Sequence, residues 1–134
     1  LSGTKAFIQK ARRLRKILGG GMRQVGILAA AGIYALEHHV ERLRIDHVRA
    51  KQLASGISEL PGVQITRDTP HTNIIFFALD DTAEIDTPTF LKKLAEKGIL
   101  IMDVGPREFR MVTHLEISDE GVGQCLQAFK DILG

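Results

Sequence analysis

The sequence predicts an α+β fold in which helices pack on a mostly antiparallel sheet. Three observations indicate this class. The chain has 134 residues, of which 44% are hydrophobic and 25% charged, which is typical of one ordinary globular domain. The first third contains only helical patterns. From about Arg44 onward the patterns follow the order helix, strand, strand, helix, strand, strand, helix, which describes helices over one sheet.

Two helices are expected before the α+β part. Residues 6–16 have apolar side chains at helical spacing between basic ones, and the glycines at 19–21 end this helix. Residues 22–41 form a second helix that is apolar on nearly all sides from Val25 to Leu36. Such a helix should be buried inside the protein or at a subunit contact, and its apolar run is too short to span a bilayer.

The α+β part has clear helix signals. A helix over 44–59 ends at Pro61-Gly62. The segment 84–98 has Asp86 or Thr87 as N-cap, Pro88 in the first turn and Gly98 past its end. Ser118, followed by two acidic residues, opens the last helix. Alternating or continuous apolar runs predict strands over 63–66, 72–79, 99–102 and 109–117, with a turn at 105–107.

The first helix carries six cations and no acid: Lys5, Lys10, Arg12, Arg13, Arg15 and Lys16. A solvated face is the ordinary interpretation, and a surface for nucleic acid or membrane phosphate is the alternative. The three following glycines match neither GxxxxGK[ST] nor GxGxxG. On physical grounds they form either a tight turn between helices or an anion site.

Arg110 is the other suggestive residue. In a strand it faces away from Phe109 and Met111, and its apolar neighbours imply that the side chain is held in place. A held guanidinium binds carboxylate or phosphate through its planar fork. A salt bridge to Asp103 or Glu116 is the equally plausible alternative.

Other reactive side chains suggest little chemistry. The five histidines have no metal-ligand spacing, since His38 and His39 point about 100° apart on a helix, and no metal is expected. The single cysteine, Cys125, lies on the apolar face of the last helix and is expected to be a core thiol. No secretory signal is visible and one cysteine suits a reducing compartment, so a cytoplasmic protein is expected.

The run GTKAFIQKARRLRKILGGGMRQVGILAAAGIYAL, residues 3–36, resembles the low-specificity threonine aldolases, as do TNIIFF and FRMVTHLEIS farther on. The resemblance implies a fold-type-I enzyme dependent on pyridoxal 5'-phosphate (PLP), usually a tetramer with active sites shared between subunits. Such a lyase cleaves L-threonine or L-allo-threonine to glycine and acetaldehyde by a retro-aldol step, with the cofactor as electron sink. It also implies that Arg110 and Lys16 bind substrate and that Arg23 binds the cofactor.

The lysine that forms the Schiff base in this family lies in an SKGxxAPxGS segment that has no counterpart here. Lys5, Lys10 and Lys16 occur outside that context, so no catalytic residue is assigned. The resemblance implies that residues 1–43 are the tail of the large PLP-binding domain and 44–134 the small C-terminal domain. The chain alone would then be inactive, with a missing N-terminal half as its partner. The alternative is a truncated, non-catalytic paralogue that acts as an oligomerisation module, and a nucleic-acid-binding domain is a distant third.

Overall fold

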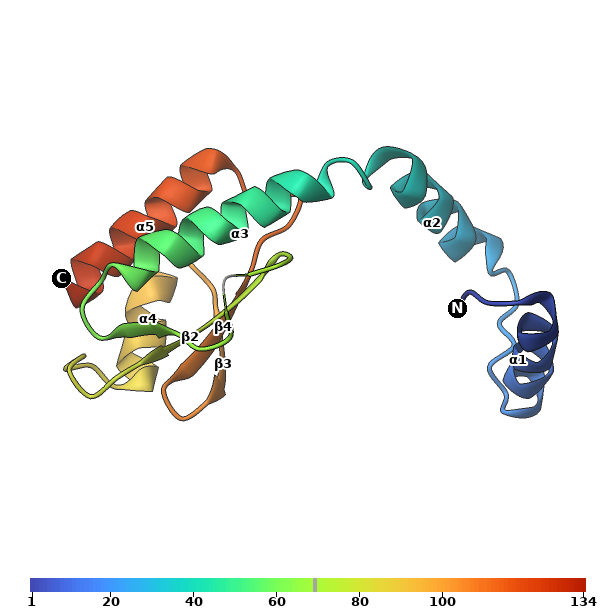
Figure 1. Ribbon diagram of the computed structural model, residues 1–134, viewed down its shortest axis with the longest axis horizontal. Coiled ribbons are helices and arrows are strands. Elements are labelled where there is room, and N and C mark those ends of the chain that lie inside the picture. Colours follow the sequence, from blue (N-terminus) through green and yellow to red (C-terminus); the bar gives the residue numbers. More distant parts are fainter. Residues whose placement is uncertain (69) are drawn as a thin grey trace. The chain divides into compact units, whose positions relative to one another are not determined.

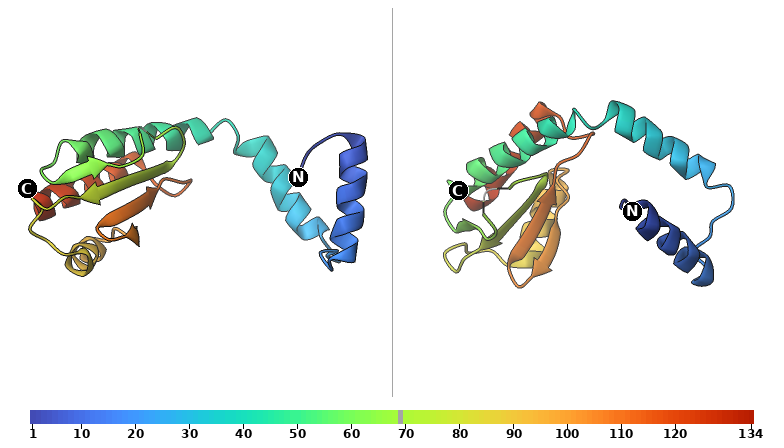
Figure 2. Two further views of the ribbon diagram at one scale, coloured as in Figure 1. Left: turned by 60° about the horizontal axis from the view of Figure 1, so that its bottom comes forward. Right: turned by 45° about the vertical axis from the view of Figure 1, so that its right-hand side comes forward.

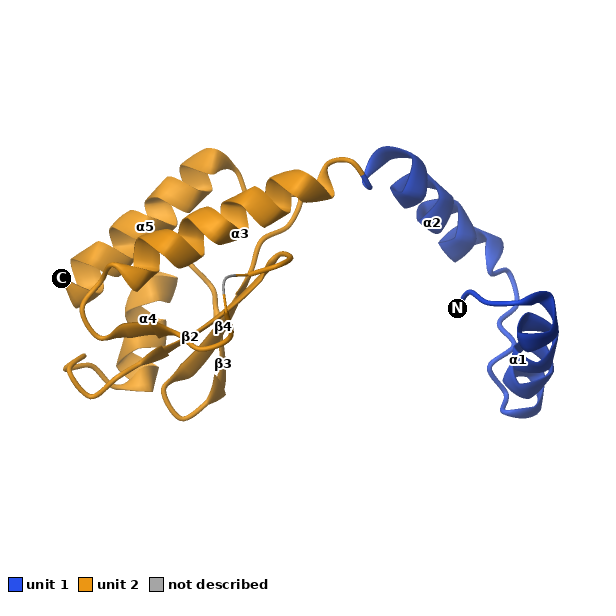
Figure 3. Cartoon of the chain, viewed as in Figure 1, with its two compact units in different colours: residues 1–40 blue, residues 41–134 orange. Residues whose placement is uncertain are grey.

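A computed structural model describes residues 1–68 and 70–134, and its internal contacts divide the chain into two compact units (Figure 3). Unit 1 comprises residues 1–40 and unit 2 comprises residues 41–134. Within the described residues, every helix is too short or too polar to cross a membrane.

Unit 1 contains two helices, α1 (Lys5–Ile17) and α2 (Gly26–His38). The hydroxyl of Thr4 caps α1 by accepting a hydrogen bond from the backbone N–H of Phe7. The second helix is shorter than the predicted 22–41. It begins only at Gly26 because the preceding residues form a turn in which Gln24 has a positive φ of 51°.

Most apolar side chains of unit 1 are exposed in the described chain. No residue of α1 or α2 is buried, and Ile27 and Leu36 are 78% and 72% exposed. A helix of this composition gains little from facing water, because burial of its apolar surface is the main source of helical stability in proteins. The expectation that α2 packs against further protein therefore stays a prediction.

Unit 2 has the predicted order of elements, shown in Figure 1. Its sheet has the strand order β1-β2-β4-β3, and all three neighbouring pairs are antiparallel. The α+β class with an antiparallel sheet is thereby confirmed. The elements are α3 (Leu43–Ser58), β1 (Val63–Ile65), β2 (Ile74–Leu79), α4 (Thr87–Glu96), β3 (Met102–Gly105), β4 (Glu108–Val112) and α5 (Asp119–Leu133).

The three helices of unit 2 cover one face of the sheet (Figures 1 and 2). Four fully buried phenylalanines from two strands and two helices form the centre of the core: Phe77, Phe90, Phe109 and Phe129. The ring centroids of Phe77 and Phe109 are 5.1 Å apart, and those of Phe90 and Phe129 are 5.5 Å apart. Alternation along β4 sends Phe109 and Met111 into this core and leaves Arg110 on the opposite face.

Helix α4 begins and ends at the predicted signals. Of the two candidate caps, Asp86 is the N-cap, and its carboxylate accepts a 2.7 Å hydrogen bond from the backbone N–H of Thr89. Hydrogen bonding from Thr89 lowers the pKa of Asp86, and the charge of Arg107 lowers it further. Gly98 follows the helix with φ 76°.

Two strand predictions were wrong at their ends. The strand expected at 99–102 lies at Met102–Gly105, because the N–H of Ile99 bonds to Leu94 O in the helix terminus and pairing with β4 starts only at Met102. The strand expected at 109–117 ends at Val112. A turn follows, in which the N–H of Ile117 bonds to His114 O.

Candidate functional site

Arg110 lies on the face of the sheet that the helices leave open. Its cross-strand partners are Phe76 on β2 and Met102 on β3. Nη2 donates a 3.2 Å hydrogen bond to the Met102 sulfur, whereas Nε is buried and has no hydrogen-bond partner among the described residues. Within residues 1–68 and 70–134 no ion pair joins Arg110 to an acid, so the salt bridge to Asp103 or Glu116 is not formed there. The open sheet face therefore carries a guanidinium that no acid of the described residues neutralises.

A second guanidinium lies beside this row of side chains. The Cζ atom of Arg67 is 3.9 Å from the centroid of the Phe76 ring, which is the geometry of a cation–π contact. Phe76 thus contacts one arginine through its face and stands opposite another across the β2–β4 pair. No signal in the sequence indicates Arg67, because its contact with Phe76 joins a residue after β1 to a side chain on β2.

Hydrogen bonds join the segments TNIIFF and FRMVTHLEIS beyond the end of β4. The backbone N–H of Thr113 bonds to Asn73 O at 2.9 Å, and the Asn73 side chain donates to Thr113 O at 2.7 Å. The buried Thr113 hydroxyl donates to the backbone carbonyl of Asp46 on α3 at 2.7 Å. Arg42 holds the Asp46 carboxylate with two hydrogen bonds. These contacts fix the strand that carries Arg110 against α3. No role for Thr113 or Asn73 was predicted from the sequence.

Lys16 and Arg23 lie in unit 1, and both are exposed. The glycines between them end α1 in a Schellman motif, in which Gly19 has φ 77° and the N–H of Gly20 bonds to Arg15 O at 2.8 Å. The tight turn is therefore formed. A Cβ added at Gly21 would be 3.8 Å from the Lys16 ammonium, so that charge lies over the glycine backbone.

The cations of this segment suit a phosphate. In the described part of the chain, neither Lys16 nor Arg23 forms an ion pair, and α1 has no acid in its first turn. Two unpaired cations beside a glycine-rich turn match the donor set that a phosphate ester needs. Lys16 and Arg23 are side chains of the kind that bind a phosphate such as that of PLP.

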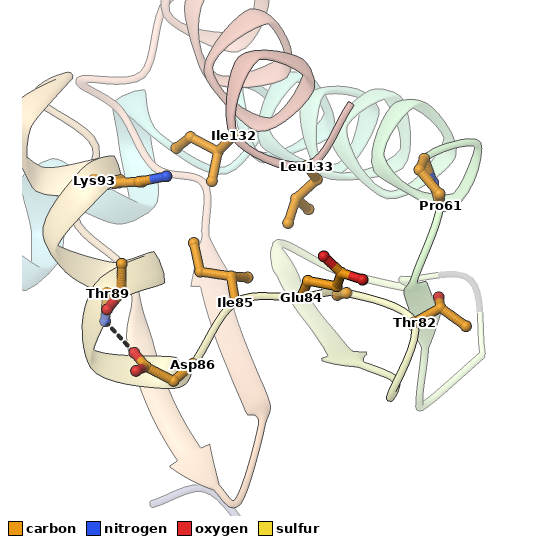
Figure 4. A pocket seen from close by; sticks show the side chains of 10 residues that line it. Pro61, Thr82, Glu84, Ile85, Asp86, Thr89, Lys93, Ile132 and Leu133 are labelled. Atoms are coloured by element: carbon orange, nitrogen blue, oxygen red, sulfur yellow. Dashed lines mark hydrogen bonds between the residues drawn. The ribbon is translucent and has the colours of Figure 1, made fainter.

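A pocket of about 460 Å³ lies in unit 2 (Figure 4). The loop at 82–86, helix α4 and the end of α5 line it, and none of Lys16, Arg23 and Arg110 does. Arg107 braces this loop by donating hydrogen bonds to four backbone carbonyls, those of Leu79, Asp80, Ala83 and Ile85. The sequence predicts Arg107 only as part of a turn, and its positive φ of 58° agrees with that turn.

Cys125 is 8% exposed and packs in the core of unit 2, as predicted. Burial raises the pKa of its thiol to about 11. The group therefore stays protonated and unreactive near neutral pH.

Alignments with related proteins extend over nearly all of this chain. It is 36% identical over 131 residues to low-specificity L-threonine aldolase 1 of Arabidopsis thaliana, with 98% of this chain and 37% of that protein aligned. It is 39% identical over 133 residues to the low specificity L-threonine aldolase of Escherichia coli K12, with 99% and 38% aligned. The chain thus spans somewhat more than a third of the length of these relatives.

Solved structures show the same fold. A protein of Exiguobacterium assigned as an aromatic amino acid beta-eliminating lyase/threonine aldolase superposes with a TM-score of 0.67 at 24% identity, over 95% of this chain and 39% of that one. A variant of the cystine lyase C-DES, with glycine covalently linked to its PLP cofactor, gives a TM-score of 0.64 at 22% identity. That match covers 80% of this chain and 28% of the other. The fold is that of PLP-dependent enzymes.

The sequence model of the beta-eliminating lyases matches residues 1–81. This segment includes the basic helix α1, the three glycines and strand β2, which contains most of TNIIFF. This match extends over more than half of the 134 residues, and the threonine aldolase relatives extend the likeness through Arg110. The chain belongs to the beta-eliminating lyase family.

Proposed function

We propose that this chain is the C-terminal part of a PLP-dependent threonine-aldolase-like lyase. The whole enzyme would cleave L-threonine or L-allo-threonine to glycine and acetaldehyde. The observation that carries the proposal is Arg110, a guanidinium without an acidic partner on the open sheet face of a chain 39% identical to a bacterial threonine aldolase. The names of the relatives support the reaction, and the PLP-bound structural neighbour supports the cofactor.

Arg110 binds the carboxylate of the amino-acid substrate. Phe76 and Met102 flank its side chain, and the contacts of Thr113 and Asn73 hold the end of its strand. A carboxylate on this guanidinium forms charge-assisted hydrogen bonds, which are about twice as strong as neutral ones. Arg110 thereby orients the substrate by its carboxylate end.

Lys16 and Arg23 supply positive charge for the substrate and for the cofactor phosphate respectively. When bound, PLP supplies an electron sink for the pair of electrons left at Cα when the Cα–Cβ bond of the substrate breaks. The lysine that anchors PLP lies outside residues 1–134 in this proposal. Consequently this chain binds and orients groups, and the covalent attachment belongs to the remainder of the enzyme.

Residues 1–43 belong to the large domain and 44–134 form the small domain of the whole enzyme. The exposed apolar side chains of α2, such as Ile27 and Leu36, are then covered by the rest of the large domain or by a second subunit of a homo-oligomer.

The test compares this chain with the protein translated from the upstream-extended reading frame. After PLP is added, bound cofactor is reduced with borohydride and the modified lysine is mapped by mass spectrometry. We expect one adduct outside residues 1–134 in the longer protein, together with acetaldehyde release from L-threonine, and neither result with the 134-residue chain. A specific adduct on Lys5, Lys10 or Lys16 would overturn the assignment of these roles.

Arg110→Ala in the longer protein tests the carboxylate contact. We expect a rise in the KM for L-threonine of roughly tenfold or more, with PLP uptake unchanged, because one charge-assisted pair is lost. Arg44→Ala removes an exposed arginine on α3 and serves as the matched control. An unchanged KM in the Arg110 variant would refute the role.

A second function is a non-catalytic oligomerisation module. The observation in its favour is α2, whose apolar side chains are exposed throughout. Light scattering of the 134-residue chain tests this function. A stable, defined oligomer that Leu28→Glu dissociates would support the module, whereas a monomer or an irregular aggregate would favour the first proposal.

A further inference from the structure

Met102 is the side chain that touches the guanidinium of Arg110. Its sulfur accepts the 3.2 Å hydrogen bond from Arg110 Nη2, and the two residues stand opposite each other across β3 and β4. Met102 is 55% exposed. The other two methionines differ, since Met111 is 5% exposed in the core and Met22 lies in unit 1.

A thioether is a weak hydrogen-bond acceptor. The Met102 thioether orders the Arg110 guanidinium without neutralising its charge. A carboxylate displaces the thioether easily, because an ionised acceptor forms a stronger hydrogen bond with the guanidinium. Oxidation changes this balance, because methionine sulfoxide carries a polar S–O group in place of the apolar thioether. Its oxygen would occupy a position next to Nη2.

We propose that Met102 is an oxidation site that controls the access of carboxylates to Arg110. In the reduced state the sulfur yields to the substrate carboxylate. In the sulfoxide state the new oxygen accepts the Nη2 hydrogen bond and competes with that carboxylate. The inference rests on the proposed role of Arg110 in substrate binding.

The oxidant is a peroxide. A lone pair of the Met102 sulfur attacks one peroxide oxygen, an S–O bond forms and the O–O bond breaks. The second oxygen leaves with the transferred proton as water, when hydrogen peroxide is the reagent. Sulfur loses two electrons and the peroxide gains them. A methionine sulfoxide reductase, with a dithiol as the two-electron reductant, converts the sulfoxide back to the thioether and releases its oxygen as water.

Access follows from the proposed function itself. A site that admits an amino acid to Arg110 also admits hydrogen peroxide, which is smaller. The sulfur in contact with Nη2 is therefore reachable in the whole enzyme whenever the carboxylate site is.

The experiment treats the longer, PLP-loaded protein with increasing hydrogen peroxide. Oxidation at each methionine is mapped by mass spectrometry, and KM and kcat for L-threonine are measured before and after incubation with methionine sulfoxide reductase. We expect Met102 sulfoxide to raise KM roughly tenfold, the equivalent of one hydrogen bond to a charged group, with kcat little changed and full reversal by the reductase.

Three variants accompany the wild type. Met102→Leu keeps the apolar volume but cannot form a sulfoxide, so its KM is expected to be the same before and after peroxide treatment. Met102→Gln places a permanent carbonyl acceptor near Nη2 and is expected to raise KM without peroxide. Met22→Leu removes the other exposed methionine of the described chain and is expected to behave as the wild type does.

Several outcomes overturn the inference: Met102 resists oxidation, its sulfoxide leaves KM unchanged, or Met102→Leu loses substrate affinity on oxidation as the wild type does. If Met102→Leu fails to fold, the rise of KM with peroxide dose in the wild type and its reversal by the reductase still test the inference. Arg110→Ala separates this inference from the proposed function. If that variant binds substrate normally, the role of Arg110 is wrong; if it binds poorly while Met102 sulfoxide has no effect, only the oxidation site is wrong.

Discussion

The helices of units 1 and 2 follow the same capping rules, but the two units differ in how many apolar side chains they bury. Helix α1 in unit 1 and helix α4 in unit 2 both end in a Schellman motif with a glycine at positive φ, Gly19 and Gly98. Both helices also have a side-chain N-cap. Yet unit 2 has a complete core of aromatic and aliphatic side chains, whereas no residue of unit 1 is buried. Good capping alone therefore does not bury apolar side chains, and we expect unit 1 to need further protein for its burial.

The largest effect expected is on the core of unit 2. Phe77→Ala should lower the free energy of unfolding by about 3–5 kcal/mol, because the ring contacts Phe90, Phe109 and Phe129 and its loss leaves a cavity. Urea denaturation followed by circular dichroism measures the change. The matched variant in unit 1 is Leu28→Ala, expected to shift the same transition by less than about 0.5 kcal/mol. Equal losses in both variants would mean that the units share one core.

The contact between Thr113 and α3 should have an intermediate effect. Thr113→Val removes the buried hydroxyl that donates to Asp46 O, and we expect a loss of about 1–2 kcal/mol in the unfolding of unit 2. Thr113→Ser keeps the hydroxyl and controls for the change of side chain. Denaturation midpoints of the two variants decide the matter, and a Val variant as stable as the Ser variant would show that the hydrogen bond contributes nothing.

The two helix-ending glycines give the sharpest comparison between the units. Gly98→Ala should destabilise unit 2 by about 1 kcal/mol through backbone strain alone, since an added Cβ meets no atom within 4 Å. Gly19→Ala has the same φ and the same open space, but it should leave the unfolding of unit 2 unchanged and reduce only the helical signal of residues 1–40. Thermal melts of both variants, with far-ultraviolet circular dichroism of a 1–40 peptide, test this. A loss of unit 2 stability in Gly19→Ala would contradict the division.

Acid should weaken unit 2 slightly. Among the described residues, the carboxyl groups whose pKa is lowered all lie there, and for Asp119 the main cause is the hydrogen bond from Arg49. Because the folded pKa is below the unfolded one, the stabilisation is complete above about pH 4 and is lost as the pH falls through the folded value. The groups are exposed, so solvent screens the effect. Urea midpoints measured across this range should depend less on pH in Asp119→Asn, and an undiminished dependence would exclude this ion pair as a source.

Much of unit 2 was predictable because its signals are local. The order of elements, an N-cap at Asp86 or Thr87 and the inward side chains of β4 follow from spacing and capping rules that neighbouring residues satisfy. The start of β3 was not predictable, because Ile99 and Ile101 are apolar enough for a strand but pack against the core from outside the sheet. Strand pairing at Met102↔Arg110 decides that boundary, and pairing is a property of distant residues.

The contrast between local signals and contacts of distant residues also applies to the candidate functional site. The sequence by itself determined the family resemblance, the six cations of the first helix and the outward direction of Arg110, since composition and period-two alternation are local properties. Only the tertiary structure decided that Arg67 stacks on Phe76, that Met102 holds Nη2 of Arg110, and that Thr113 bonds to α3. These contacts join residues on different strands and helices, and their geometry depends on sheet register and helix packing, which no single stretch of sequence specifies.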